Sequence, residues 1–160
     1  MSSRCLCLTF SLAVWAGCVF PSLAADKQGC PITKPSDRFV PPPPYELNVG
    51  SREFLYGTPT LWTVIYPDWH IHSGGKLPFF RQGYDATKER NPRLTVVAGR
   101  LDGNAALVWN TWANSASSMA GMFMTTGIDI AASGCREIAA HYVASPDNIK
   151  TLSCIAWVEP

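Results

Sequence analysis

The chain has no run of like charges, which limits the partners that bulk electrostatics can recruit. Its 160 residues hold 13 lysines and arginines against 12 aspartates and glutamates, and charged residues make up only 16% of the sequence. A basic stripe is the electrostatic footprint of a nucleic-acid-binding surface, and none is present. We therefore expect no nucleic-acid partner.

Short motifs that mark common active sites are also missing. No Gly-x-Ser-x-Gly elbow surrounds the serines within positions 115–118, and no Gly-rich phosphate cradle occurs. The acidic residues Glu46, Glu53 and Glu137 lack the paired spacing that glycosidases use. The sequence thus predicts a protein that is not an enzyme.

No long window repeats apolar residues at the helical i, i+3, i+4, i+7 spacing. The 13 prolines and 12 glycines instead favour a turn-rich β protein. About seven short strand candidates, separated by turn signals, predict an all-β fold, specifically an antiparallel β-sandwich of immunoglobulin-like type. The strongest candidates are Leu61–Tyr66, which we expect to be a central strand, and Arg93–Leu101. Pro67–Lys76 and Asn114–Ser118 are predicted loops.

A hairpin near the C-terminus is the best-defined element. Two β-type runs, Gly134–Val143 and Thr151–Val158, flank the connector Ala144–Lys150, which contains Pro, Asp and Asn. Alternation along the two strands predicts one buried face that carries Ile138, Ala140 and Tyr142, then Leu152, Cys154, Ala156 and Val158.

Residues 1–25 have the features of a secretory signal peptide. Arg4 is followed by the apolar run Leu6–Phe20, and Ser22-Leu23-Ala24 has the small-x-small pattern that precedes a cleavage site. The run is shorter than the ~20 residues that a membrane-spanning helix needs. We expect an exported protein, periplasmic or secreted, with no transmembrane span in the mature chain.

A second possibility for the leader is lipidation. Val14-Trp15-Ala16-Gly17-Cys18 resembles a bacterial lipobox, so the alternative is a lipoprotein anchored through Cys18. Arg4 is the only charged residue of the leader, which leaves the mature chain with as many basic as acidic side chains. After the leader we expect a proline-rich N-terminal arm over residues 26–50 and the sandwich domain over residues 51–160.

The arm contains four consecutive prolines, Pro41–Pro44, directly after Phe39-Val40. Such a segment favours the extended polyproline II conformation. It is either a docking ligand for an aromatic groove or a stiff arm laid along the domain. We favour the second hypothesis, because cytosolic groove modules of that kind would not meet an exported chain.

Several of these segments resemble a family of small exported bacterial proteins of uncharacterised function. The matching segments are Cys30-Pro31-Ile32-Thr33, Leu61-Trp62-Thr63-Val64, Leu94-Thr95-Val96 with Gly99-Arg100-Leu101-Asp102, and Gly134-Cys135-Arg136-Glu137. The family pattern is C-P-V-T, L-W-T-V, L-T-V-x-G-R-x-L-D and G-C-W-E-V-T-G, so Arg136 stands where the pattern has Trp. The resemblance implies an export signal and an immunoglobulin-like sandwich, and it implies no activity.

Three of the six cysteines fall in the leader, which leaves Cys30, Cys135 and Cys154. An odd number permits at most one internal disulfide. The expected hairpin register puts Cys154 opposite about Ala140, roughly 16 Å along the strand from Cys135, whereas a disulfide spans at most ~7 Å between Cα atoms. We therefore predict a Cys30–Cys135 disulfide, with Cys154 a small buried residue rather than a reactive thiol.

His70 and His72 are candidate metal ligands. In an extended chain, residues two apart project to the same side, a spacing that a Zn or Cu site can use. His141 or Asp68 would complete the site.

Trp69 and Trp112 are the aromatic residues that we expect to be most exposed, and exposed rings form a platform for sugars or peptides. The leading hypothesis is an exported, non-catalytic binding or accessory module of the cell envelope, which uses these tryptophans to bind a protein or carbohydrate and needs no cofactor. The alternative is a metal-binding protein built on His70 and His72. The third is a weak thiol or hydrolytic enzyme.

Overall fold

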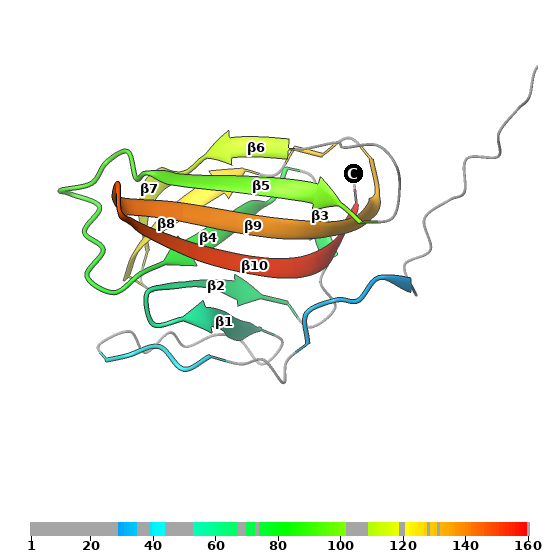
Figure 1. Cartoon of the computed structure of the whole chain (residues 1–160), viewed down its shortest axis with the longest axis horizontal. Helices are drawn as coiled ribbons and strands as arrows, with labels where there is room; N and C mark the ends of the chain where they lie inside the picture. The colour runs from blue at the N-terminus through cyan, green and yellow to red at the C-terminus, as the bar shows by residue number, and fades with distance from the viewer. Residues whose placement is uncertain are drawn as a thin grey trace, which may run out of the picture.

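The computed structural model describes residues 29–34, 39–43, 53–66, 70–72, 74–101, 109–118, 121–127, 129–130 and 132–159. The regular elements of these residues include ten β-strands, arranged in two five-stranded sheets that face each other (Figure 1). This confirms the predicted all-β sandwich, although the predicted count of about seven strands was too low. The proposed signal peptide, with Cys18, lies outside the described residues.

Sheet A and sheet B each hold strands from distant parts of the sequence. In spatial order, sheet A contains β1 (Phe54–Thr58), β2 (Leu61–Ile65), β4 (Lys76–Phe80), β8 (Gly121–Gly127) and β7 (Asn114–Ser118). Sheet B contains β3 (His70–His72), β10 (Asn148–Glu159), β9 (Gly134–Ser145), β5 (Leu94–Arg100) and β6 (Trp109–Trp112). Strands β3 and β10 are parallel, and the other pairs are antiparallel.

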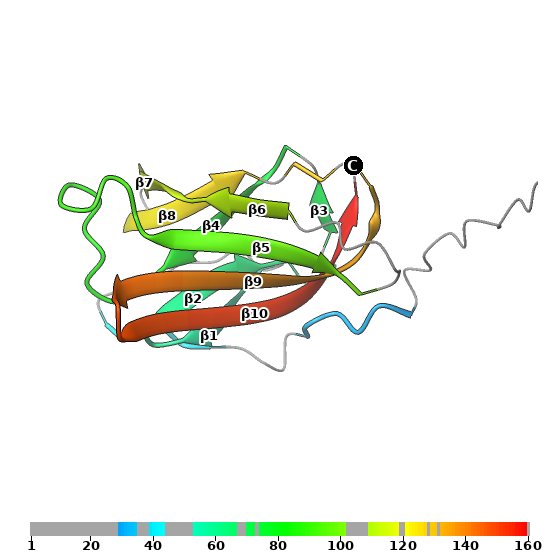
Figure 2. The same ribbon diagram turned by 45° about the horizontal axis from the view of Figure 1, so that its top comes forward.

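The predicted hairpin is formed by β9 and β10, the two longest strands (Figure 2). The strands extend to Ser145 and from Asn148, so the connector is much shorter than predicted and the register differs by two residues: Cys154 lies opposite Ile138. A two-residue shift leaves every side chain on its predicted face, because side chains alternate with a period of two. All seven residues predicted for the buried face are buried.

The core lies between the sheets. From sheet A it receives Phe54, Leu61, Ile65 and Phe79, and from sheet B the inward residues of β5, β9 and β10. Strand β2 lies between β1 and β4, as predicted for a central strand. Its Trp62 points to the opposite face of sheet A, where it forms a separate cluster with Leu55 and Phe80.

Two predicted loops contain strands. Residues 70–72 form β3, because Ile71 reaches the core while the backbone pairs with the end of β10. Asn114–Ser118 forms β7 at the edge of sheet A, directly after Ala113 at the end of β6 in sheet B. The chain therefore crosses from one sheet to the other within a single residue, and Ala113 N–H donates to the Leu94 carbonyl at 3.0 Å.

The described parts of the N-terminal arm lie along the domain (Figure 1). This agrees with the favoured hypothesis of a stiff arm laid along the domain. Thr33 N–H donates to the Ile155 carbonyl at 3.1 Å, and Ile155 N–H donates to the Thr33 hydroxyl at 2.9 Å. Further along, Phe39 N–H donates to the Leu55 carbonyl at 2.8 Å. The arm thus contacts β10 of sheet B and β1 of sheet A.

Gly57 sits inside β1, and the β1–β2 turn follows at Pro59 and Thr60. Its φ is +143°, and a Cβ there would lie 2.4 Å from the Leu61 carbonyl oxygen and 2.6 Å from Trp62 Cα. Only glycine permits both this backbone conformation and this approach.

Candidate functional site

The predicted disulfide is confirmed. Cys30 and Cys135 are bonded, with their Cα atoms 5.4 Å apart. Cys135 lies opposite Trp157 of β10, and Trp157 packs against the disulfide with Ile32 of the arm. The bridge therefore holds the arm over the outer face of sheet B at one end of the sandwich.

The two candidate metal ligands lie at the ends of β3. His70 pairs with Trp157 and His72 with Glu159. His72 is exposed, whereas the side chain of His70 lies outside what the structure describes, as does Asp68. Within the described residues, no group of three or more His, Cys, Asp or Glu side chains could hold a metal ion.

His141 does not complete that site. It pairs with Thr151, six residues along β10 from the partner of His70, which corresponds to roughly 20 Å at the rise of a β-strand. Two ligands of one metal ion must lie within a few ångströms of each other. The proposed histidine pair stays a prediction without this third ligand.

The predicted aromatic platform is only partly located. Trp69 lies outside the described residues, and for Trp112 the structure gives the backbone alone. Trp112 ends β6 and pairs with Thr95, which pairs with His141, which in turn pairs with Thr151. Its backbone position therefore continues a row that crosses β5, β9 and β10.

This row belongs to the outer face of sheet B. Residues one position away along each strand, such as Val96 and Ala140, are in the core. On the outer face, the exposed side chains include Glu137, His141, Ile149, Thr151 and Ser153, and the half-buried ones include Thr95, Val97 and Ala139. Ser153 Oγ donates to Glu137 Oε1 at 2.5 Å. The centre of this face therefore carries small apolar side chains, with polar groups beside them.

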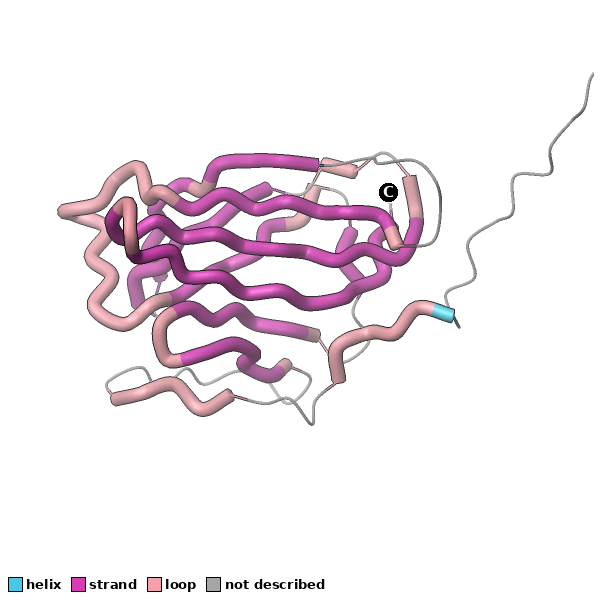
Figure 3. Tube along the Cα trace, in the orientation of Figure 1, coloured by secondary structure: helices cyan, strands magenta, loops and turns pink. Residues whose placement is uncertain are grey.

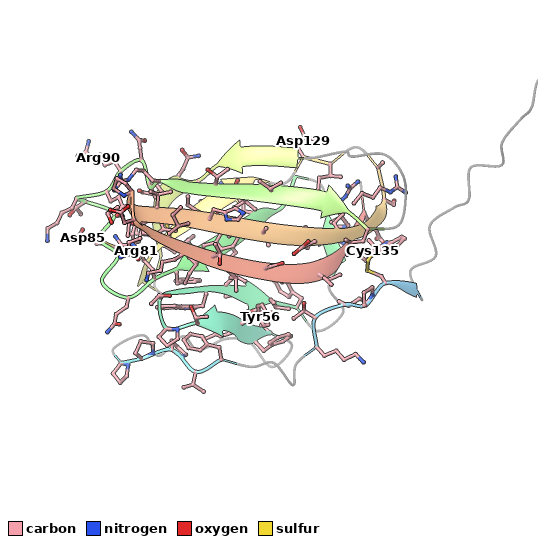
Figure 4. The ribbon with its side chains drawn as sticks, in the orientation of Figure 1. Tyr56, Arg81, Asp85, Arg90, Asp129 and Cys135 are labelled. Atoms are coloured by element: carbon pink, nitrogen blue, oxygen red, sulfur yellow. A yellow bond between two sulfur atoms is a disulfide. The ribbon has the colours of Figure 1, made fainter. Side chains whose placement is uncertain are left out.

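A polar cluster that the sequence did not predict lies at the end of the sandwich opposite Cys135 (Figure 4). Arg81, just after β4, pairs with Glu89 at 2.5 Å between Nη2 and Oε2. The Tyr142 hydroxyl donates to Glu89 at 2.9 Å, and the Arg81 guanidinium lies 4.8 Å from the Tyr142 ring centroid. The Tyr84 hydroxyl and Ser115 Oγ are 2.6 Å apart.

The two tyrosines of this cluster have raised pKa values. Burial raises the pKa of Tyr142, and its hydrogen bond to Glu89 raises the pKa further. Burial likewise raises the pKa of Tyr84. Both phenols therefore stay protonated at neutral pH and act as hydrogen-bond donors. The Ser115 hydroxyl also contacts the carbonyls of Glu89 and Arg90, so β7 holds the same loop.

The loop itself is ordered by Asp85. Its carboxylate accepts hydrogen bonds from the Thr87 backbone N–H at 2.9 Å and the Thr87 hydroxyl at 2.6 Å. These bonds, with the nearby Lys88, lower the pKa of Asp85 to about 2.

One sequence signal could have indicated the polar cluster: a tyrosine at the buried end of a strand needs a polar partner for its hydroxyl.

Cys154 is buried and unbonded to another cysteine, as predicted. Burial raises its pKa to about 12, and the charge of Glu137 adds to the effect. Reactive cysteines have lowered pKa values because the thiolate is the nucleophile. At neutral pH this thiol is therefore protonated and enclosed.

Arg136 is the largest charged side chain in the interior. It is fully buried, and its Nη2 donates to the Ala132 carbonyl at 2.9 Å. This hydrogen bond ties the start of β9 to the segment that leads into it.

Comparison with family models, with curated proteins and with solved structures gives no match for this chain. Among the described residues, no helix has the length and apolar character needed to cross a membrane.

Proposed function

We propose that this protein is an exported, non-catalytic binding or accessory module of the cell envelope, with an immunoglobulin-like sandwich that binds a protein partner through the outer face of sheet B. Export is supported by the signal-like leader and by the Cys30–Cys135 bridge, because disulfides persist in oxidising compartments.

The observation that carries the proposal is the difference between the two outer faces. On sheet A, Trp62 and Phe80 point outward but are buried, and Phe39 of the arm packs against Trp62. On sheet B, His141 and Thr151 are exposed. The arm packs on the aromatic side chains of sheet A, whereas on sheet B it contacts only the end of the outer face near Cys135 and leaves His141 and Thr151 exposed.

The chemistry of this face suits a protein partner. Non-obligate protein interfaces combine a small apolar centre with a polar rim. Val97 and Ala139 lie side by side at the centre, and Glu137 and His141 lie on either side of Ala139 along β9. The long antiparallel strands β5, β9 and β10 lie side by side across this face (Figure 3), and their backbone pairing limits the entropy lost on binding.

Site-specific photo-crosslinking in the exporting cell tests the binding face. A photoreactive amino acid at Thr151 should give a discrete crosslinked species, whereas the same group at Lys88, an exposed residue of the β4–β5 loop, should not. A species that shifts after glycosidase treatment would identify a carbohydrate instead. Identical patterns from the two positions, or none from Thr151, would refute the proposed face.

Intact mass of the protein from that cell tests export. We expect a chain that begins near Ala25, with one alkylatable cysteine before reduction and three after it. A diacylglycerol-modified chain that begins at Cys18 would identify an anchored lipoprotein. Three free thiols without reduction would contradict the oxidised state.

A further inference from the structure

Strand β8 carries two methionines on one face of sheet A. Met122 and Met124 are two residues apart, so their side chains point to the same side of the sheet. Met124 is fully buried in the core, whereas Met122, nearer the start of the strand, is 37% exposed. Solvent therefore reaches one of these two thioethers and not the other.

Met122 contacts the β4–β5 loop through its sulfur. The Ala86 backbone N–H donates to Met122 Sδ at 3.2 Å. Ala86 is half-buried and packs against the core. The hydrogen bond therefore joins β8 to a loop residue that lies 36 positions earlier in the chain.

The sulfur binds the first part of a tight turn. The Asp85 carbonyl accepts the backbone N–H groups of Lys88 at 3.1 Å and Glu89 at 2.9 Å. In a helical turn the first N–H groups point away from the carbonyls of the turn itself and need acceptors from elsewhere. Ala86 has such an N–H group, and Met122 of β8 supplies its acceptor.

We propose that Met122 is a site of oxidation by peroxides, and that its sulfoxide form releases the Ala86 N–H. The thioether sulfur attacks one oxygen of hydrogen peroxide, so that an S–O bond forms as the O–O bond breaks. The sulfur gives up two electrons, the proton on the attacked oxygen moves to the departing one, and the peroxide leaves as water. The product is methionine sulfoxide.

The sulfoxide cannot keep the hydrogen bond in its present place. Its negative charge lies on the new oxygen and its sulfur is partly positive, so the sulfur no longer attracts an N–H. A normal N–H···O bond takes about 2.9 Å between its heavy atoms, which leaves no room for an oxygen within the 3.2 Å between Met122 Sδ and Ala86 N. Either the side chain turns away or the turn moves, and in both cases Ala86 loses this acceptor.

The rest of the loop keeps its contacts. Glu89 pairs with Arg81 and accepts the Tyr142 hydroxyl, and neither interaction involves sulfur. The effect of oxidation is therefore confined to the start of the turn. This site is separate from the outer face of sheet B, so it does not depend on the proposed function.

Hydrogen peroxide added to the folded protein tests the site. Samples taken over time are digested, and fragmentation of the peptide that contains Met122 and Met124 locates the added oxygen. We expect the Met122 sulfoxide to form at least about tenfold faster than the Met124 sulfoxide, because reactivity follows exposure. In the protein unfolded by guanidinium, the two rates should be equal. Equal rates in the folded protein would overturn the proposal.

Amide exchange measures the release of the turn. NMR of the ¹⁵N-labelled protein follows exchange of the Ala86 N–H with solvent before and after peroxide treatment. We expect this exchange to become at least about threefold faster, the size expected for one lost hydrogen bond. The N–H of Val96, in the core of sheet B, should keep its rate. A Met122 sulfoxide with an unchanged Ala86 rate would refute the proposal.

Met122→Leu is the matched control. Leucine has nearly the volume of methionine but no sulfur, so Ala86 should exchange rapidly in this variant and peroxide should not change its rate. In the oxidised wild type, methionine sulfoxide reductase should restore slow exchange, because it returns the sulfoxide to the thioether. An effect of peroxide on Ala86 that persists in Met122→Leu would assign the oxidation to another residue and contradict the proposal.

Discussion

The hydroxyl of Tyr142 donates to both oxygens of the Glu89 carboxylate, at 2.9 and 3.1 Å. Tyr142 belongs to β9 of sheet B, and Glu89 to the loop that leaves β4 of sheet A. The same carboxylate pairs with Arg81. One side chain therefore joins the two sheets at the end of the sandwich that has no disulfide.

Replacement of Tyr142 by Phe should lower the free energy of unfolding by about 1.5–3 kcal/mol, the usual value for a hydrogen bond to a charged group. The ring and its contact with Arg81 remain, so the loss reports the hydroxyl alone. Urea unfolding measures it. Combined with Glu89→Gln in a double-mutant cycle, the two changes should be non-additive by more than 0.5 kcal/mol, the usual size of such coupling. Strict additivity would show that the pair is not coupled.

Loss of the disulfide should be similarly costly. Cys30→Ser opens a bridge between residues 105 positions apart, and the free energy of unfolding should fall by ~2–4 kcal/mol. Guanidinium unfolding of the variant and of the reduced wild-type protein should give similar losses. A loss below about 1 kcal/mol in both would mean that the bridge adds little to the contacts of the arm.

Cys154 predicts a pH dependence above neutrality. Its folded-state pKa of about 12 exceeds the ordinary value of 9.0, so the folded state holds the proton more tightly. The contribution is complete below pH 9 and is lost as the pH rises from 9 towards 12, by up to ~1.4 kcal/mol per pH unit. The stability difference between wild type and Cys154→Ala should therefore fall over this range. Tyrosine ionisation cancels in this comparison, and a constant difference would contradict the prediction.

Gly57 offers a test of backbone packing. Gly57→Ala should lower the free energy of unfolding by more than ~2 kcal/mol, because strain at positive φ is joined by overlap with the backbone of Leu61 and Trp62. Gly74→Ala is the control: its φ is +82°, but nothing lies within 4 Å of the added Cβ. Chemical unfolding of both should show the larger loss at Gly57. Equal losses would assign the effect to φ alone.

The sequence predicted the features that follow from the alternation of inward and outward side chains along a strand. Strands β9 and β10 have long, regular patterns, so their buried faces were correct even though the register was two residues off. The pairing of Cys30 with Cys135 was predicted because the hairpin register puts Cys154 too far along the strand from Cys135 for a disulfide. The structure also places the two on opposite faces, Cys154 inward and Cys135 outward.

Such patterns do not predict very short strands or contacts between residues that are far apart in the sequence. His70–His72 is a strand because its backbone pairs with the end of β10. A segment of three residues has too little pattern to predict a pairing with a strand so far along the chain. The polar cluster depends on Tyr142 meeting Glu89 across 53 positions. No local pattern in the sequence places the Glu89 carboxylate against a buried phenol.

The position of Cys30 also sets an order of events during synthesis. Ribosomes deliver the N-terminus first, so Cys30 emerges 105 residues before the strand that carries its partner. Before β9 has been synthesised, sheet B is incomplete and the Cys30 thiol cannot form this bridge. The bridge can therefore form only after Cys135 has been synthesised, so until then no disulfide holds the arm to the rest of the domain.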